Sequence, residues 1–319
     1  GEPLADLGLR YDLTVPLARV VAEHRNDISL PYKRYQIAPV WRADRPQKGR
    51  YREFYQCDLD IVGTEAKLAE VEVANASAEI LNKLGFKDFR IHLNHKSLLQ
   101  GFLDFAEVPE SLREDALIAI DKQDKIGLDG VESELESRGL SAEAVGKLMS
   151  LLELGANRDV DPGQIANSHV LEALVDKLAE IEGVESAVAD LQDILEFAGD
   201  GPASEHLYVD PSLARGLSYY TGPLFEIRSD AFSGSIGAGG RYDDLIGMFA
   251  GREYPACGLS LGIERILVIM EENEMFEGKT APADVVVTRW SDELTSTSVE
   301  ITSAFRQKGL RADLYSDTD

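Results

Sequence analysis

Alternating apolar and polar positions mark two strands between Tyr32 and Gly63, which are joined by a loop at Ala43–Arg50. Period-two alternation is typical of a strand whose two faces meet different surroundings. In the second strand one face carries Tyr55, Cys57, Leu59 and Ile61, and the other carries Phe54, Gln56, Asp58 and Asp60. We expect the apolar face to pack on a core and the polar face to line a ligand site beside the loop.

Helices and further strands follow the hairpin. The pattern predicts a helix that starts after Thr64 and stops at Gly85, then a strand around Phe89–Leu93. Strand patterns return at Leu207–Asp210 and continue to the segment PACGLSLGIERILVIM, in which a glycine-rich strand leads directly into a helix. Because these strands show little β–α–β alternation, the pattern predicts an α+β fold with an antiparallel β-sheet flanked by helices.

Two segments depart from this pattern. Residues 97–205 show helical periods almost throughout, which indicates a helical insertion between two β-rich parts, 1–96 and 206–276. At residues 283–319 the pattern is strand, helix, strand, the start of an α/β domain. A single βαβ unit cannot bury both faces of its sheet, so we expect this domain to be truncated, and the chain to be truncated at Gly1 as well.

The charge of the chain is uneven. The 319 residues carry a net charge of −25, and residues 101–200 hold seven Lys or Arg against twenty-four Asp or Glu. Residues 30–52, by contrast, hold seven Lys or Arg and one Asp. A solvated charged hairpin is one interpretation of that basic stretch. The alternation with aromatic residues and the paired carboxylates favours an anion-binding site.

Composition excludes several classes of protein. The chain shows no apolar run of membrane-spanning length and no signal peptide. Its two cysteines, Cys57 and Cys257, lie in apolar strand-like surroundings, which indicates reduced thiols in a cytoplasmic protein. The five histidines show no metal-ligand spacing, so we expect no protein-bound metal. The strong acidity argues against nucleic-acid binding by net charge alone.

Three segments have both a structural and a functional interpretation. The glycines of GSIGAGGRYDD do not have the GxGxxG spacing of a dinucleotide-binding loop. They allow close approach of a flat ligand or of another strand, or they mark a bulged strand. Arg215, just before Tyr219 and Tyr220, fits a satisfied core network as well as a group that stabilises developing negative charge. Arg265 begins a helix, where it fits an anion site or a surface turn.

Taken together, four segments closely resemble histidyl-tRNA synthetases, the class II ligases that load histidine onto its tRNA. WRADRPQKGRYREFYQCDLD resembles motif 2 of the class, and GLSLGIERI resembles motif 3. LRYDLTVP and LARGLSYYTGPLFE resemble the two histidine-recognition segments of the family. The resemblance runs from Leu9 to Tyr315 and implies a class II sheet, a helical insertion and an α/β anticodon-binding domain.

The resemblance also implies roles for residues that bind ATP. Arg42 would bind the α-phosphate of ATP and the carboxylate of histidine, and Asp44, where the family usually has Glu, would serve the adenine side. Arg50 would contact the β- and γ-phosphates, and Arg265 the γ-phosphate. Mg²⁺ would accompany ATP, without a tightly bound cofactor. Arg215 would be the catalytic arginine, together with Arg42.

For the amino acid, the resemblance implies that Asp12 and Thr14 hold the α-amine and that Gln56 and Asp60 complete the pocket. The full predicted set of histidine-binding residues is Asp12, Leu13, Thr14, Arg42, Gln56, Asp60, Arg215, Tyr219, Tyr220 and Tyr242, of which Tyr219 and Tyr220 would face the imidazole. The implied partners are L-histidine, ATP and tRNA(His), with a homodimer in the cytoplasm and no membrane.

Two catalytically silent relatives remain as alternatives. One is the regulatory subunit that some bacteria pair with ATP phosphoribosyltransferase; it would be expected to lose the catalytic arginine and the anticodon domain. The other is a pseudo-synthetase module that senses uncharged tRNA within a kinase, in which motifs 2 and 3 would be eroded. Arg215, both motifs and a segment starting near Ala283 favour the ligase. Motif 1, which should precede Leu9, is absent, so we expect the chain by itself to dimerise poorly or by a non-native surface, and to be weakly active or inactive.

Overall fold

The computed structural model describes residues 7–155, 164–215, 219–276 and 282–315. The chain forms two compact units, residues 1–269 and residues 270–319. The first holds the sheet and most helices, and the second holds one small βαβ unit. Each is described by itself below. No helix among the described residues has the length and apolar character needed to cross a membrane.

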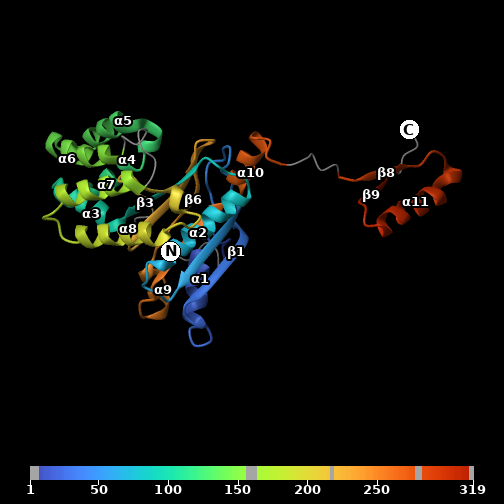
Figure 1. The fold of residues 1–319 in the computed structure, drawn as a ribbon, viewed down its shortest axis with the longest axis horizontal. Helices are drawn as coiled ribbons and strands as arrows, with labels where there is room; N and C mark the ends of the chain where they lie inside the picture. Colours follow the sequence, from blue (N-terminus) through green and yellow to red (C-terminus); the bar gives the residue numbers. More distant parts are fainter. Residues whose placement is uncertain (1–6, 156–163, 216–218, 277–281, 316–319) are drawn as a thin grey trace. The chain divides into compact units, whose positions relative to one another are not determined.

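The first unit is built on a seven-stranded sheet (Figure 1). Its strands are β1 Tyr32–Trp41, β2 Glu53–Val62, β3 Phe89–His95, β4 Leu207–Val209, β5 Pro223–Ser229, β6 Phe232–Arg241 and β7 Ala256–Gly262. They lie in the order β1-β2-β7-β6-β5-β3-β4. Every neighbouring pair is antiparallel except β3 and β4, which are parallel. The predicted α+β fold with an antiparallel sheet is confirmed, and the edge strand β4 is its parallel exception.

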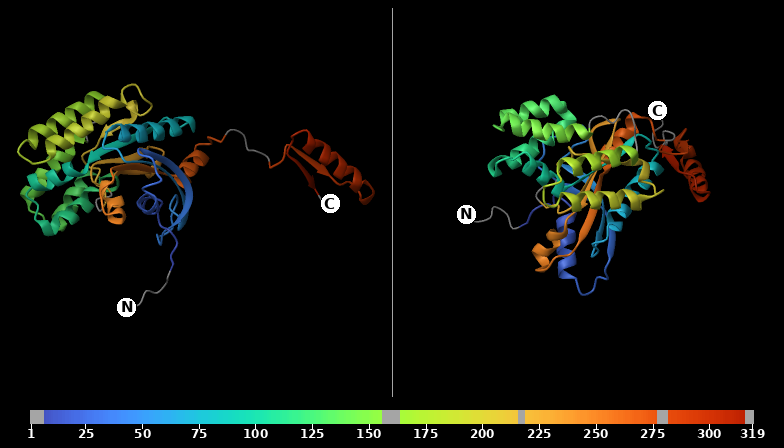
Figure 2. Two further views of the ribbon diagram at one scale, coloured as in Figure 1. Left: turned by 90° about the horizontal axis from the view of Figure 1, so that it is seen from below. Right: turned by 60° about the vertical axis from the view of Figure 1, so that its left-hand side comes forward.

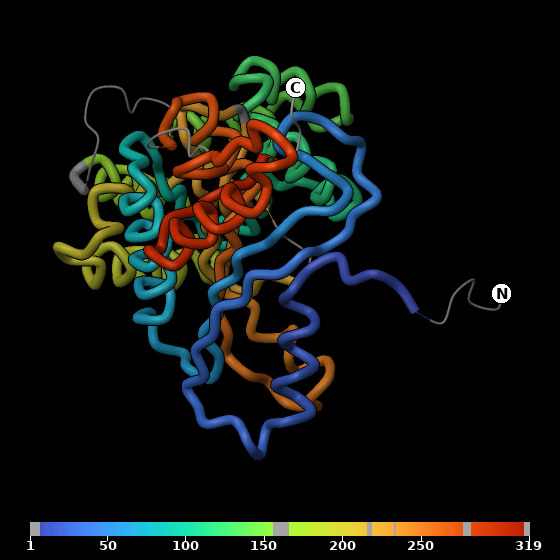
Figure 3. The backbone as a smooth tube through the Cα atoms, turned by 90° about the vertical axis from the view of Figure 1, so that its right-hand side faces the viewer, coloured from blue at the N-terminus to red at the C-terminus, as the bar shows by residue number. Residues whose placement is uncertain are grey.

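Helices flank this sheet. They include α1 Thr14–Glu23, α2 Leu68–Lys83, α8 Val184–Ala198, α9 Asp243–Ala250 and α10 Ile263–Glu272. α2 packs on β2 and β7, and α8 packs on β3 and β5, so both lie on the same side of the sheet (Figure 2). α1 and α9 pack on each other beside the β1–β2 hairpin (Figure 3).

The described part of the segment between β3 and β4 is mainly helical, as its sequence predicts. It contains α3 Lys96–Phe105, α4 Glu110–Ile120, α5 Gln123–Ser137, α6 Ala142–Leu152, α7 Gln164–Lys177 and α8. These helices gather at one end of the first unit (Figure 1). They pack on one another and, through α7 and α8, on the sheet, so they belong to the same compact unit as the strands. The proposed limits of a separate domain at 97–205 stay a prediction.

Pairing across the sheet separates an apolar face from a polar one. Directly paired residues share a face, so the register defines rows that cross several strands. One row is apolar and lies under α2 and α8: Leu59, Leu259, Gly239, Phe225 and Leu93. The neighbouring row faces the opposite side: Gln36, Asp58, Ser260, Ala238, Glu226 and His92. The polar face of β2 therefore continues across the sheet as far as β3.

Burial on β2 corrects one expectation. Gln56, Asp58 and Asp60 are only 8%, 2% and 3% exposed, whereas Tyr55 on the apolar face is 47% exposed. The prediction that the apolar face packs on a core holds for Ile61 and is wrong for Tyr55. The reason is that α2 packs against the other end of the hairpin, where Glu72 accepts hydrogen bonds from Lys33.

The second unit contains β8 Val285–Thr288, α11 Thr295–Gln307 and β9 Ala312–Tyr315. β8 and β9 are parallel neighbours, and α11 packs on both. Arg311 and Asp284 join the two strand starts through an ion pair of 2.7 Å. The βαβ unit predicted from the pattern is confirmed, and its assignment to an anticodon-binding domain stays a prediction.

Candidate active site

The polar face of the sheet carries a cavity of about 700 Å³. Strands β2, β6 and β7 form its floor, and the loop after β1, the start of α1 and the segment after β4 contribute walls. Every residue predicted for the site except Leu13 lines it: Asp12, Thr14, Arg42, Asp44, Arg50, Gln56, Asp60, Arg215, Tyr219, Tyr220, Tyr242 and Arg265. Residues far apart in the sequence thus converge on one cavity.

Leu13 has a different place. Its side chain is 0% exposed and belongs to the core, while its carbonyl oxygen accepts a hydrogen bond of 3.0 Å from Arg34 Nη2. The flanking residues Asp12 and Thr14 line the cavity, because α1 begins at Thr14 and Asp12 precedes the helix. The Asp12 carboxylate accepts a hydrogen bond from the backbone N–H of Val15. Burial raises the pKa of Asp12, and Arg42 and Arg34 oppose that shift.

Small residues bring the floor close to the carboxylates. A Cβ atom at Gly258 would lie 2.1 Å from Asp60 Oδ1, and one at Gly239 would lie 2.2 Å from the carbonyl oxygen of Gly258. The glycines of GSIGAGGRYDD and of motif 3 therefore permit close packing of strands β2, β7 and β6. The segment GSIGAGGR lies within strand β6, which pairs with β5 on one side and β7 on the other. Its glycines therefore allow close approach of another strand, as the sequence predicts. The pairing of β6 with β5 is irregular near Arg228, which fits the bulged strand that the sequence also allowed.

Asp60 is a buried carboxylate of the cavity with two partners. It accepts a hydrogen bond from the Tyr242 hydroxyl and forms an ion pair of 2.9 Å with Arg34 Nη2. Burial raises the pKa of Asp60, and Arg34 counteracts this shift. Sequence reasoning did not include Arg34, although its pairing opposite Asp60 follows from the hairpin register.

Gln56 and Asp58 leave acceptor atoms free beside Asp60. Gln56 Nε2 donates to Ser260 Oγ at 2.9 Å. Gln56 Oε1 and Asp58 Oδ1 are buried, and neither has a hydrogen-bond partner among the described residues. Burial raises the pKa of Asp58 to about 7, although a hydrogen bond with Ser260 opposes the shift. Because an unsatisfied buried acceptor is costly, these two atoms are well placed to receive N–H donors of a ligand.

The raised pKa of Asp58 predicts a pH-dependent stability. Between about pH 4 and about pH 7, folded Asp58 holds a proton that the unfolded chain has lost, so stability falls as the pH rises through this window. We expect the free energy of unfolding of the wild type, relative to Asp58→Asn, to fall by up to about 4 kcal/mol between these pH values and then to stay constant. Urea unfolding at a series of pH values measures this difference. A difference that does not change with pH would contradict the burial of an ionisable Asp58.

Arginines gather at the other end of the cavity. Arg42 Nε donates to the carbonyl oxygen of Tyr11 at 3.0 Å, and Arg265 Nε donates to that of Gly49 at 3.1 Å. Arg50 pairs with Asp44 at 2.9 Å, and this hydrogen bond lowers the pKa of Asp44. Burial and then the charge of Arg215, followed by that of Arg50, lower the pKa of Arg265. Neighbouring cations that lower the pKa of Arg265 in this way favour a bound polyanion such as a triphosphate.

Three tyrosines form an aromatic wall. The ring centroids of Tyr219 and Tyr220 are 4.3 Å apart, and those of Tyr219 and Tyr242 are 6.5 Å apart in an edge-to-face arrangement. Tyr220 and Tyr242 are buried, and Tyr219 is partly exposed. The wall and the carboxylates of Asp12 and Asp60 line the same cavity, so a small aromatic cation could meet both.

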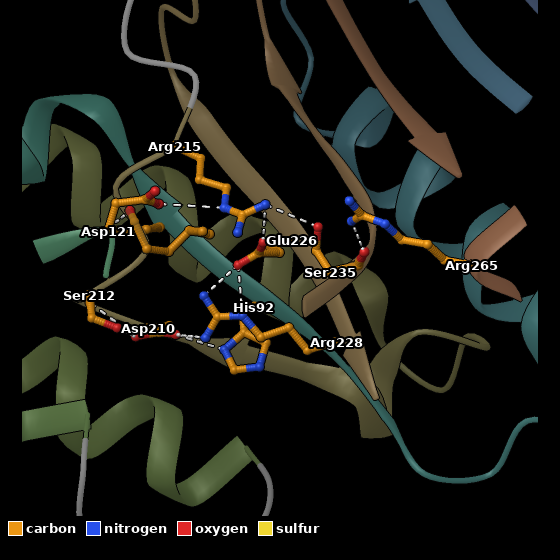
Figure 4. A network of polar contacts seen from close by, with 11 residues as sticks. His92, Asp121, Asp210, Ser212, Arg215, Glu226, Arg228, Ser235 and Arg265 are labelled. Carbon is orange, nitrogen blue, oxygen red and sulfur yellow. Dashed lines mark hydrogen bonds and ion pairs between the residues drawn. The ribbon is translucent and has the colours of Figure 1, made fainter. Parts of the chain in front are cut away.

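Arg215 lines the cavity and also belongs to a network of polar contacts (Figure 4). Its Nη1 lies 2.6 Å from Glu226 Oε1 and donates to Ser235 Oγ at 3.0 Å. Its Nε lies 3.4 Å from Asp121 Oδ1. Arg215 therefore belongs to a network of satisfied polar groups, and its role in stabilising developing negative charge stays a prediction.

Solved structures share this fold. A histidyl-tRNA synthetase from Nostoc sp. PCC 7120 matches with a TM-score of 0.77 and 29% identity, over 97% of this chain and 70% of that one. A Bacillus halodurans protein described as an ATP phosphoribosyltransferase regulatory subunit/histidyl-tRNA synthetase matches with a TM-score of 0.74 and 25% identity, over 97% of this chain and 75% of that one. The sheet, its cavity and these matches define the class II synthetase fold.

Sequence comparison defines the family. The family profile described as histidyl-tRNA synthetase matches residues 4–266. The histidine–tRNA ligase of Porphyromonas gingivalis is 42% identical over 97% of this chain, and that of Leifsonia xyli subsp. xyli is 45% identical over 84% of it. The chain belongs to the histidyl-tRNA synthetase family. It spans 66% and 61% of the lengths of these two relatives, about two thirds.

Proposed function

We propose that the complete protein is a histidine–tRNA ligase, which activates L-histidine with ATP and transfers it to tRNA(His). The observation that carries this proposal is the arrangement of the cavity: buried carboxylates and an amide at one end, and Arg42, Arg50, Arg215 and Arg265 at the other. A substrate with an ammonium group, a carboxylate and a basic ring fits the first end. A triphosphate fits the second.

The proposed first step joins two anions. A carboxylate oxygen of histidine attacks the α-phosphorus of ATP, the bond to the bridging oxygen breaks, and pyrophosphate leaves with the electron pair of that bond. Arg42 brings the carboxylate and the α-phosphate together, and Arg215 stabilises the charge that builds on the α-phosphate. Arg50 and Arg265 hold the β- and γ-phosphates, and Asp44 serves the adenine side.

Mg²⁺ would arrive with ATP, because phosphate oxygens are its preferred ligands. Among the described residues, no group of three or more His, Cys, Asp and Glu side chains is arranged to hold a metal ion. We assign the ion to the substrate, where its chemistry would be to neutralise phosphate charge.

Selection of histidine is assigned to the carboxylate end. Asp12 and Thr14 would hold the α-ammonium group, and Gln56 and Asp60 would complete the pocket, with Tyr219 and Tyr220 against the imidazole. Polar groups that lose their partners reject apolar amino acids strongly, because a buried donor or acceptor left unpaired costs more than the contact gains. Transfer to tRNA(His), a homodimer and a cytoplasmic location follow from the family and stay proposals.

The test is histidine-dependent exchange of pyrophosphate into ATP by the complete protein. We expect exchange with histidine and only background with the other standard amino acids. The regulatory-subunit alternative keeps one specific observation in its favour, the description of the Bacillus halodurans structure. Under that alternative the protein binds histidine in calorimetry without any exchange, and this result would refute the ligase.

A further inference from the structure

Glu226 divides its two carboxylate oxygens between two arginines (Figure 4). It lies on β5 and is 0% exposed. Oε1 is 2.6 Å from Arg215 Nη1, and Oε2 accepts a hydrogen bond of 2.7 Å from Arg228 Nε. A buried carboxylate requires paired cations to stay charged. Glu226 therefore fixes Arg215 of the cavity relative to a second arginine that does not line it.

Arg228 has a second carboxylate partner. Asp210 Oδ2 lies 3.4 Å from Arg228 Nη1 and 2.7 Å from His92 Nδ1. Asp210 Oδ1 accepts hydrogen bonds from the Ser212 hydroxyl and backbone N–H, at 2.6 and 3.0 Å. Burial opposes the charge of Asp210, but the hydrogen bond with His92 and the charges of His92 and Arg228 together lower its pKa. Asp210 thus shares the positive charge of Arg228 with Glu226 Oε2. The other oxygen of Glu226, Oε1, pairs with Arg215.

Asp121 holds Arg215 from the helical segment. It follows the end of α4 and places Oδ1 at 3.4 Å from Arg215 Nε, while Ser235 on β6 accepts from Nη1. Nε and Nη1 of the guanidinium are thus both engaged by groups of the protein, while Arg215 also lines the cavity.

We infer that Glu226 is the positioning residue for Arg215 and that Asp121 makes this positioning depend on the helical segment between β3 and β4. The inference rests on the proposed function, in which Arg215 stabilises the α-phosphate. Glu226 restricts the guanidinium, because ion pairs at Nη1 and Nε together with the hydrogen bond from Nη1 to Ser235 leave it little freedom to rotate. Movement of the α4–α5 corner would change that orientation through Asp121.

The experiment compares Glu226→Gln and Asp121→Asn in the complete protein, each alone and combined with Arg215→Ala. We expect Glu226→Gln to lower kcat of exchange about tenfold or more, and Asp121→Asn about three- to tenfold, with KM for histidine changed less than about threefold. In the Arg215→Ala background both should have almost no further effect on kcat, because groups that act as a unit are not additive. Glu226→Asp, which keeps the charge, should restore part of the rate.

Asp129→Asn is the matched control, since Asp129 is exposed on α5 and forms no ion pair with any residue that the structure describes. An unchanged kcat in both variants overturns the inference, as does an equal loss with and without Arg215. If Glu226→Gln fails to fold, Asp121→Asn still tests the inference, because Asp121 is partly exposed and its variant can be compared with and without Arg215→Ala in the same way. A wild type without exchange refutes the proposed function itself, whereas normal exchange with silent variants refutes only this inference.

Discussion

Replacing Arg215 with alanine is expected to slow histidine-dependent exchange by about 100-fold or more while histidine affinity changes by only a few-fold. Negative charge builds on the α-phosphate as the reaction proceeds, so a cation directed at it contributes most in the transition state. Arg215 is well suited to this role because it lines the cavity while Glu226 and Asp121 hold its guanidinium. Exchange kinetics and calorimetric titration with histidine measure the two quantities separately.

Two further variants show whether charge or geometry matters. Arg215→Lys keeps the charge and loses the planar fork, so we expect a rate between those of the wild type and the alanine variant. Arg19→Ala removes an exposed arginine whose ion-pair partner is Glu23, one turn away on α1, and should leave exchange unchanged. An alanine variant with the wild-type rate would remove Arg215 from the mechanism.

Replacing Glu70 with alanine is expected to destabilise the first unit by about 3–5 kcal/mol. Glu70 on α2 is 0% exposed and binds Arg241 through two contacts, Oε1–Nε at 2.6 Å and Oε2–Nη2 at 2.9 Å. Without Glu70, the buried Arg241 keeps only Asp243 as an ion partner among the described residues, at 3.1 Å. Urea unfolding of the wild type and the variant measures the loss.

The same helix supplies the control. Glu72 forms an exposed ion pair with Lys33, and Glu72→Ala is expected to cost no more than about 1 kcal/mol. Arg241 directly precedes Tyr242, whose hydroxyl donates to Asp60, so Glu70→Ala should also raise KM for histidine. Equal stability of the two variants would show that the Glu70–Arg241 pair does not secure α2 to the sheet.

The strands were predictable because their alternation is strong, but the sequence does not say which face is covered. Period two separates Tyr55 from Gln56, yet the burial of Gln56 depends on β7, about two hundred positions later in the chain. The parallel pairing of β3 and β4 was equally hidden, since it depends on the path of the helical segment between them. The local pattern of apolar and polar residues thus predicts the strands, whereas packing between distant parts of the chain determines which of their faces is buried and which strands pair.

The candidate site shows the same division. Motif resemblance identified Arg42, Arg215 and Arg265, which the fold brings to one cavity. It did not identify Asp58 or Glu226, because their roles follow from burial and from cross-strand partners. Leu13 was included by its place between Asp12 and Thr14, and the start of α1 directs its side chain into the core.

The central claim is that this cavity joins the carboxylate of histidine to the α-phosphate of ATP. Native mass spectrometry of the complete protein, incubated with histidine, Mg·ATP and pyrophosphatase, tests it most directly. We predict a bound species with the mass of histidyl-adenylate in the wild type and its near absence in Arg215→Ala. Histidine and ATP bound together as unreacted ligands in the wild type, with no adenylate, would contradict the account.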